Sequence, residues 1–231
     1  SGAVNVAARF TSTNMDAAQT EVSESTRTAT FTPGRDAARK EASKLNVPRI
    51  GVRFRLPASM NQVEYFGRGP AENYLDRNAG SMVGLYKSTA EELYFPYVRP
   101  QENGHHTDTR WVSLSTGKKG LLIQADNTIG FNALRNSIED FDDEEATGLS
   151  RQWSNFTPEQ VANHDEAAAK NVLRRQHHIN DITPCDFVEV CVDLKQQGVA
   201  GYDSWGSRPE PAYTLPANRE YNWGFTLIPL K

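Results

Sequence analysis

The chain has 231 residues, of which 38% are hydrophobic and 23% charged, and a mean hydropathy of -0.63, values typical of a globular protein with much loop and surface. Its formal charge of -4 argues against nucleic acid or an anionic membrane as partner, because both bind a dense basic face. No apolar run approaches the roughly 20 residues that span a bilayer.

Short stretches of alternating apolar and polar residues recur along the chain, bounded by Gly, Pro, Asn and Asp. This pattern is typical of half-buried antiparallel strands. In chain order, the predicted strands are residues 4–10, 27–32, 50–56, 62–66, 109–115, 120–125, 130–136, 174–179, 187–194 and 221–228. Two polar stretches, 13–25 and 34–44, are interpreted as long loops.

One segment predicts a helix. Thr157 is suited to the N-cap, Pro158 to the first helical position and Gln160 to a capping box, and residues 161–173 are rich in Ala, Glu and Lys. We therefore expect a short helix near 158–173 that decorates the sheets. Weaker helical turns are expected near 70–74 and after Ser88.

The element pattern favours one fold class. More than about ten short strands with little helix predict an all-β protein, built as a large antiparallel sandwich of two sheets. No segment resembles an interdomain linker, so residues 1–231 are expected to form a single domain.

Several clusters of titratable residues are candidates for catalytic or metal sites. The acidic run at 140–145 is typical of a solvated turn, because packed like charges repel one another. His177 and His178 would point to opposite faces of a strand, so they cannot both coordinate one metal ion. His105 and His106 follow a turn-like Asn-Gly, where packing is the default and a ligand-facing imidazole is the alternative.

The two cysteines, Cys185 and Cys191, lie six residues apart in one predicted stretch. Their Cα atoms would be about 20 Å apart at roughly 3.3 Å per residue, too far for a disulfide with each other.

The four tryptophans differ in context. Trp111 and Trp223 lie in alternating strands and are interpreted as core residues, and Trp153 as packing at the entry of the predicted helix. Trp205 stands in a Gly-rich segment between two strands, with no strand to pack into. Since sugar rings stack their C–H faces on aromatic planes, Trp205 is either a sugar contact or a loop-packing residue.

Four motifs occur in order from about residue 45 to the C-terminus: Pro-Arg-Ile-Gly at 48–51, Phe-Gly-Arg-Gly-Pro-Ala-Glu-Asn-Tyr at 66–74 followed by Asp76-Arg77, Pro-Tyr-Val-Arg-Pro-Gln-Glu-Asn-Gly at 96–104, and Asp-Ser-Trp at 203–205. Together they resemble the final domain of the large bacterial β-galactosidases of glycoside hydrolase family 2. That resemblance implies an antiparallel sandwich related to galactose mutarotases. The family's domain begins well before residue 1, so N-terminal strands are expected to be missing here.

The resemblance implies a division of labour. The catalytic glutamates and the Mg and Na ions belong to a separate catalytic barrel, so no cofactor is expected in this chain. The implied partners are that barrel and galactosides such as lactose, in an enzyme expected to be a homo-oligomer. Trp205, with Asp203 and Ser204, is expected to contact the substrate, and His106 is a further candidate.

The chain departs from the family pattern before this tryptophan. The family loop usually reads Gly-Val-Gly-Gly, whereas Ala200 replaces one glycine here, and Tyr202 stands where an acidic or small residue is common. Because Ala tolerates positive φ less well than Gly, a different loop conformation is expected.

Two alternatives remain open at this point. An aldose 1-epimerase (mutarotase) needs a general acid and base across one sugar ring, which His106 with Asp108 could supply. The second alternative is a stand-alone carbohydrate-binding or purely structural module.

Overall fold

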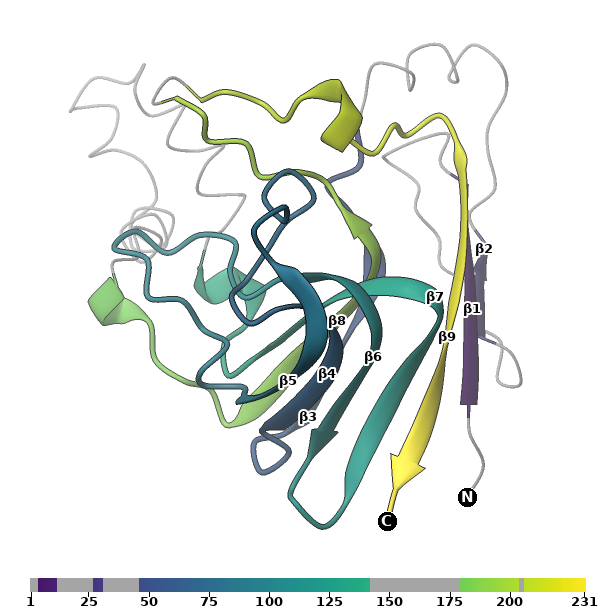
Figure 1. The fold of residues 1–231 in the computed structure, drawn as a ribbon, viewed down its shortest axis with the longest axis vertical. Coiled ribbons are helices and arrows are strands. Elements are labelled where there is room, and N and C mark those ends of the chain that lie inside the picture. The colour runs from purple at the N-terminus through teal and green to yellow at the C-terminus, as the bar shows by residue number, and fades with distance from the viewer. Residues whose placement is uncertain (1–3, 12–26, 31–45, 142–178, 204–205) are drawn as a thin grey trace, which may run out of the picture.

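The computed structural model describes residues 4–11, 27–30, 46–141, 179–203 and 206–231 (Figure 1). Its strands are β1 (Val4–Thr11), β2 (Arg27–Thr30), β3 (Arg49–Pro57), β4 (Gln62–Gly69), β5 (Met82–Thr89), β6 (His106–Ser115), β7 (Gly120–Leu134), β8 (Phe187–Gln196) and β9 (Glu220–Leu230). Three short 3-10 helices, η1 (Ile138–Asp140), η2 (Ile179–Asp181) and η3 (Pro211–Tyr213), lie between them. The all-β prediction is confirmed.

The predicted helix near 158–173 and Trp153 lie outside the described residues. Within the described part of the chain, no helix is long and apolar enough to cross a membrane.

The strands form one connected sheet in the order β2-β1-β9-β7-β6-β4-β5, with β8 joined to β7 and β3 joined to β8. Figure 1 shows this order across the molecule, from β5 and β4 on one side to β1 and β2 on the other. The pairings are antiparallel except that between β1 and β2.

Strand β7 is the branch point of the sheet. Its first half, Gly120–Ala125, pairs with β9, and its second half, Gly130–Leu134, pairs with β8. Strand β6 pairs along the opposite edge of β7 through both halves. Beyond β7 the sheet therefore divides into two arms, one of β9, β1 and β2 and the other of β8 and β3. The sequence predicted two separate strands where this single bent strand lies.

One hydrophobic core joins the two arms. Inward-facing side chains of β4, β6, β7, β8 and β9 form a single buried cluster, and β3 packs against it with alternate residues, as expected from the period of two in a strand. This packing of strands across a shared core is consistent with the predicted sandwich. Its members from the strands are Val63, Tyr65, Val112, Leu114, Ile123, Ile129, Phe131, Ala133, Leu134, Val188, Val190, Val192 and Phe225.

Strand β8 is buried on both faces, and arginines of β3 neutralise the charged residues of its second face. Glu189 accepts from Arg55 Nε at 3.0 Å and lies 3.4 Å from Arg53 Nε, and Asp193 lies 3.1 Å from Arg49 Nε. Cys191 lies between the two carboxylates on the same face, and both cysteines are free.

Strand β5 was not predicted. Its outward-facing residues Val83 and Leu85 are apolar although they are exposed, and Gly84 occupies an inward position, so the sequence shows no alternation of apolar and polar residues. The predicted strand 174–179 is wrong at Ile179, which lies in η2, while residues 174–178 are outside the described part.

The two described tryptophans of the strands lie on different faces. Trp223 packs against the core, as predicted. Trp111 pairs with Phe66 and Gln124 and borders a surface groove on the outer face, so its prediction as a core residue is wrong. Alternation shows which residues share a face but not which face points inward.

Candidate functional site

The segment that carries the Asp-Ser-Trp motif connects β8 to η3. Ser204 and Trp205 lie outside the described residues, and the flanking residues 198–203 and 206–207 are described. Asp203 Oδ1 accepts a hydrogen bond from Ser207 N at 3.3 Å, and Ser207 Oγ accepts one from Tyr202 N at 3.0 Å. These two bonds close the loop around the predicted sugar-contact position.

A single carboxylate anchors the start of this loop. Asp76 accepts hydrogen bonds from the backbone of Val199 at 3.1 Å and of Ala200 at 2.8 Å, and from the Tyr202 hydroxyl at 3.3 Å. A Cβ atom at Gly198 would lie 2.5 Å from Asp76 Oδ2. Glycine is therefore required at 198 for the backbone to approach the carboxylate.

The loop reverses direction through left-handed backbone. Ala200 has a φ of 54°, and Gly201 and Gly206 each have a φ of 80°. An alanine in this region is uncommon because its Cβ crowds the backbone. Ala200 is nevertheless only 5% exposed and held by its bond to Asp76. Ala200 thus keeps a positive φ, although this conformation is less favourable for alanine than for glycine.

The segment that carries Asp76 is itself fixed by a buried asparagine. Asn73 is fully buried, its Oδ1 accepts from Thr107 N at 2.9 Å and Thr107 Oγ1 at 2.6 Å, and its backbone N–H donates to His105 O at 2.7 Å. Tyr74 and Arg77 then exchange backbone hydrogen bonds of 3.4 and 2.8 Å, which place Asp76 in a tight turn. The turn predicted at 70–74 therefore forms at 74–77 instead.

Glu72 links this segment to the residues before β6. Its carboxylate accepts from Gly104 N at 2.7 Å, from the Tyr74 hydroxyl at 3.0 Å, and from the Tyr97 hydroxyl. Burial and the hydrogen bond to Glu72 raise the pKa of Tyr97 to about 12, and burial raises that of Tyr74 as well. Both phenols therefore stay protonated and can keep donating to the carboxylate.

The structure places His106 in the core rather than on a surface. The ring is 0% exposed and lies between Tyr65 and Phe131, with centroids 5.0 Å from each. Its Nδ1 and Nε2 lie 3.1 and 3.3 Å from the carbonyl oxygens of Gly104 and Pro70. Burial lowers the pKa of this imidazole, so it is neutral near pH 7.

The structure does not present His106 and Asp108 as an acid–base pair. The Asp108 carboxylate is 2.5 Å from Arg68 Nε and partly exposed, whereas both ring nitrogens of His106 face backbone carbonyls.

His105 belongs to a second buried polar cluster. Its Nδ1 donates to Asn132 Oδ1 at 2.8 Å, an atom that also accepts from Arg49 at 2.7 Å. Burial, reinforced by the charge of Arg49, lowers the pKa of His105 to about 3. Burial raises the pKa of Asp193 to about 7, opposed by its contact with Arg49.

A cavity of about 180 Å³ lies next to this cluster, over the second face of β7 and β8. Glu102, Asn132 and Glu189 line it together with the apolar Leu134 and Phe141. Each of these three side chains is already engaged by an arginine or a backbone group. Within the described residues, no group of three or more His, Cys, Asp or Glu side chains could hold a metal ion.

The acidic run is described only at its first member. Asp140 accepts from Ser137 N at 2.7 Å at the start of η1, and residues 142–145 lie outside the described part.

The residues that shape the loop were present in the sequence motifs but were not predicted as site residues. Asp76, Glu72 and Asn73 all lie in the stretch 66–77, about 120 positions before the loop. The signal that could have found them is a cluster of short polar residues directly after a strand, at a position where a turn needs side-chain acceptors.

Comparison with known proteins identifies the family of the chain. The family model described as "Beta galactosidase small chain" matches residues 2–227. A β-galactosidase of Priestia megaterium is 35% identical over 185 residues, which are 80% of this chain and 15% of that protein. A β-galactosidase of an Arthrobacter species is 40% identical over 46% of this chain and 11% of its own length, and one of Vibrio cholerae is 29% identical over 78% and 14%.

The chain thus spans about one seventh of the length of these curated relatives. The matching family model covers nearly all of its residues, including the anchored loop and both arms of the sheet. The chain belongs to the β-galactosidase small-chain family.

Proposed function

We propose that this chain is the accessory sandwich of a β-galactosidase and that it completes the galactoside site with Trp205 without hydrolysing the bond itself. The observation that carries the proposal is the loop 198–207, which Asp76 anchors and which holds the Asp-Ser-Trp motif. Hydrogen bonds that hold the residues on either side of Trp205 suit a stacking role, because less ordering entropy is then lost when sugar binds.

Asp203 and Ser204, two of the other predicted sugar contacts, belong to this loop, whereas His106 does not. Asp203 is tied to Ser207 and is proposed to shape the loop next to Trp205, with Ser204 between them. A sugar contact by His106 would require its fully buried ring to become uncovered. The loop therefore carries the proposal.

The buried carboxylates in the described part of the chain favour an accessory role. A glycosidase needs two carboxyl groups about 5 to 9.5 Å apart. The buried carboxylates of the described residues are Glu189 and Asp193, whose Cα atoms are roughly 13 Å apart on one strand at 3.3 Å per residue, and arginines neutralise both. The hydrolytic carboxylates, and the ions of the resembled enzymes, are therefore proposed to lie in the catalytic part.

The first test is the hydrolysis of a chromogenic galactoside by the isolated chain. No turnover above the buffer rate is expected. Turnover at a rate typical of enzymes would overturn the accessory role.

The second test concerns Trp205 in the assembled enzyme. Trp205→Ala should lower kcat/KM about fivefold, since an aromatic stack contributes roughly 1 kcal/mol and 1.4 kcal/mol is a factor of ten. Trp205→Phe keeps an aromatic face and should retain most of the activity. An unchanged kcat/KM for the alanine variant would overturn the stacking role.

A further inference from the structure

A groove crosses the outer face of the sheet at Trp111. Its volume is about 380 Å³, within the range of about 300–1,000 Å³ for small-molecule sites. Strand register places its lining on one face, because Trp111 pairs with Gln124, and Ser113 pairs with both Glu64 and Leu122. The described residues that line it, which together define the Trp111 groove, are Glu64, Trp111, Ser113, Leu122, Gln124 and Leu230.

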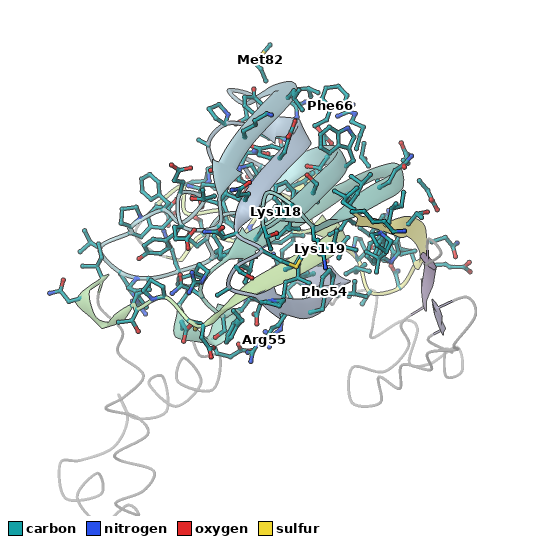
Figure 2. The ribbon with its side chains drawn as sticks, turned by 90° about the horizontal axis from the view of Figure 1, so that it is seen from below. Phe54, Arg55, Phe66, Met82, Lys118 and Lys119 are labelled. Carbon is teal, nitrogen blue, oxygen red and sulfur yellow. The ribbon has the colours of Figure 1, made fainter. Side chains whose placement is uncertain are left out.

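Phe66 shows where this face lies in the molecule. It pairs with Trp111 across β4 and β6, so the two side chains share a face, and it is 38% exposed. Figure 2 shows Phe66 on the side of the molecule away from Phe54 and Arg55 of β3. Strands β6 and β7 have hydrogen-bonded neighbours on both edges here, so a ligand reaches the groove through side chains and not by strand addition.

The Trp111 groove combines an aromatic plane with polar groups that can bind a ligand. The indole N–H of Trp111 and the carboxamide of the exposed Gln124 form no hydrogen bond with the described residues. The Glu64 carboxylate lies 3.2 Å from Lys87 Nζ, which neutralises it, and a carboxylate has further acceptor positions. Ser113 Oγ donates to the Glu64 carbonyl oxygen at 3.3 Å, so this hydroxyl can still accept.

A neutral sugar ring matches this combination of groups. Its C–H face stacks on an indole plane, and its hydroxyl groups both donate and accept, as the carboxamide of Gln124 does. The described residues that line the groove include no Lys or Arg. The groove therefore offers no cation to a phosphate or carboxylate, and a neutral ligand suits it best.

A second hollow continues the groove over β4, β5 and β6. Its volume is about 420 Å³, it shares Glu64 and Ser113 with the Trp111 groove, and its described lining residues are all polar except Val63. From β9 to β5 the two hollows cross four strand spacings, about 19 Å at about 4.8 Å each. A chain of several sugar rings fits this length, whereas an apolar peptide would leave the polar groups without partners.

We infer that the Trp111 groove binds a neutral oligosaccharide. Trp111 provides the plane on which one ring stacks, Gln124 and Glu64 bind hydroxyl groups of that ring, and the second hollow receives the rings that follow. None of these residues belongs to the loop 198–207. The inference thus goes beyond the proposed function and does not depend on it.

The indole N–H groups of the four tryptophans provide separate reporters in NMR spectra of the ¹⁵N-labelled chain. The chain is titrated with two neutral probes, galactotetraose and cellotetraose, and the probe that binds identifies the sugar. The Trp111 signal, assigned by its loss in Trp111→Phe, should shift saturably with a Kd in the millimolar range. The signal of Trp223, which packs against the core, should not move.

Two variants separate sugar binding from a disturbed fold. Gln124→Leu keeps the size of an exposed side chain but removes its hydrogen-bonding groups, so it should raise Kd about fivefold and leave the melting temperature unchanged. The matched control is Asn222→Leu, because Asn222 is also an exposed amide but lies at the other end of β9 from Leu230. This control should leave Kd unchanged.

A Trp111 signal that stays in place with both probes would overturn the inference. A saturable shift of the Trp205 signal in that experiment would still support the proposed function, so the two can fail separately. If the Trp111 signal shifts as the chain is concentrated without sugar, a second copy covers the groove and the sugar assignment is wrong. Equal Kd values for Gln124→Leu and Asn222→Leu would also contradict the assignment.

Discussion

Three residues of the loop 198–207, at positions 200, 201 and 206, have left-handed backbone. The conformation of this loop therefore depends on the residue type at these positions. The sequence showed only that Ala200 replaces a glycine, and φ cannot be derived from the residue type alone. The structure keeps the positive φ because Asp76 binds the amide of Ala200. That acceptor is about 120 positions away in the sequence, so no local pattern identifies it.

Ala200→Gly should stabilise the chain by about 0.5–1 kcal/mol, because glycine adopts positive φ without a steric cost. Gly201→Ala is the matched reverse change: its φ is 80° and an added Cβ would meet nothing within 4 Å, so only backbone strain is introduced. Urea unfolding of both variants measures the effect. The same sign for the two changes would contradict the strain argument.

His105 should make stability depend on pH. Its pKa is about 3 in the folded chain and about 6.5 when unfolded, so the unfolded state binds the proton first as pH falls. The stability from the neutral ring is therefore fully present above pH 6.5 and is lost toward pH 3, by up to about 1.4 kcal/mol per pH unit. Urea unfolding of the wild type and of His105→Gln between pH 4 and 8 tests this. The free energy of unfolding of the wild type minus that of His105→Gln should be constant above pH 6.5 and should decrease below pH 6.5.

At the scale of elements, the strands with strong alternation were the ones that the sequence predicted well. Strand β3, with Val52, Phe54 and Leu56 inward and arginines outward, was found within one residue at each end. Strand β5 was missed because its outward-facing residues Val83 and Leu85 are as apolar as the inward-facing Tyr86, so the sequence shows no alternation of apolar and polar residues. The branch at β7 was missed because pairing between distant strands is not encoded in a local period.

Asp76→Ala should detach the sugar loop from the β4–β5 connection. Two backbone N–H groups, those of Val199 and Ala200, would lose their acceptor, at a cost of roughly 1–3 kcal/mol for each group left buried. Amide hydrogen exchange at these two positions should rise by at least tenfold. Asp76→Asn retains one oxygen acceptor and should show an intermediate rate, and equal exchange in all three proteins would exclude the anchoring role.

Gly51→Ala should disrupt the β3–β8 pairing. An added Cβ would lie 2.0 Å from Asp193 Oδ1 and 2.7 Å from the Val192 carbonyl oxygen, so the backbone would have to shift, at a cost of about 2–4 kcal/mol. Gly80→Ala is the control, because a Cβ there meets nothing within 4 Å. Thermal unfolding should show a large loss for the first variant and a change within about 0.5 kcal/mol for the second.

At the scale of the whole molecule, one charged group connects three parts of the fold. Arg49 of β3 contacts Asp193 of β8, Asn132 of β7 and Glu102 of the segment before β6. The sequence predicted the sandwich class but not this cluster, because charged residues in strands are expected to face solvent. Here the second face of β8 is buried, and the charges persist because they are paired.

Removing one partner of the Arg49–Asp193 pair should be far more damaging than removing both. Arg49→Met leaves a buried carboxylate without its cation and should destabilise the chain by about 3–5 kcal/mol. Asp193→Leu should have a similar effect, and the double variant should recover a large part of the loss. A double-mutant cycle by urea unfolding measures the coupling, and strictly additive losses would show that the pair does not act as a unit.

The shared strand β7 has a consequence for how this family can change in evolution. A slip of β7 by one residue would turn its side chains over and spoil the register with β6, β8 and β9 together. An insertion or deletion within 120–134 would therefore disturb the pairing of β7 with three strands at once. Relatives of different length are expected to accommodate their extra residues in the connections between strands, while β7 keeps a constant length.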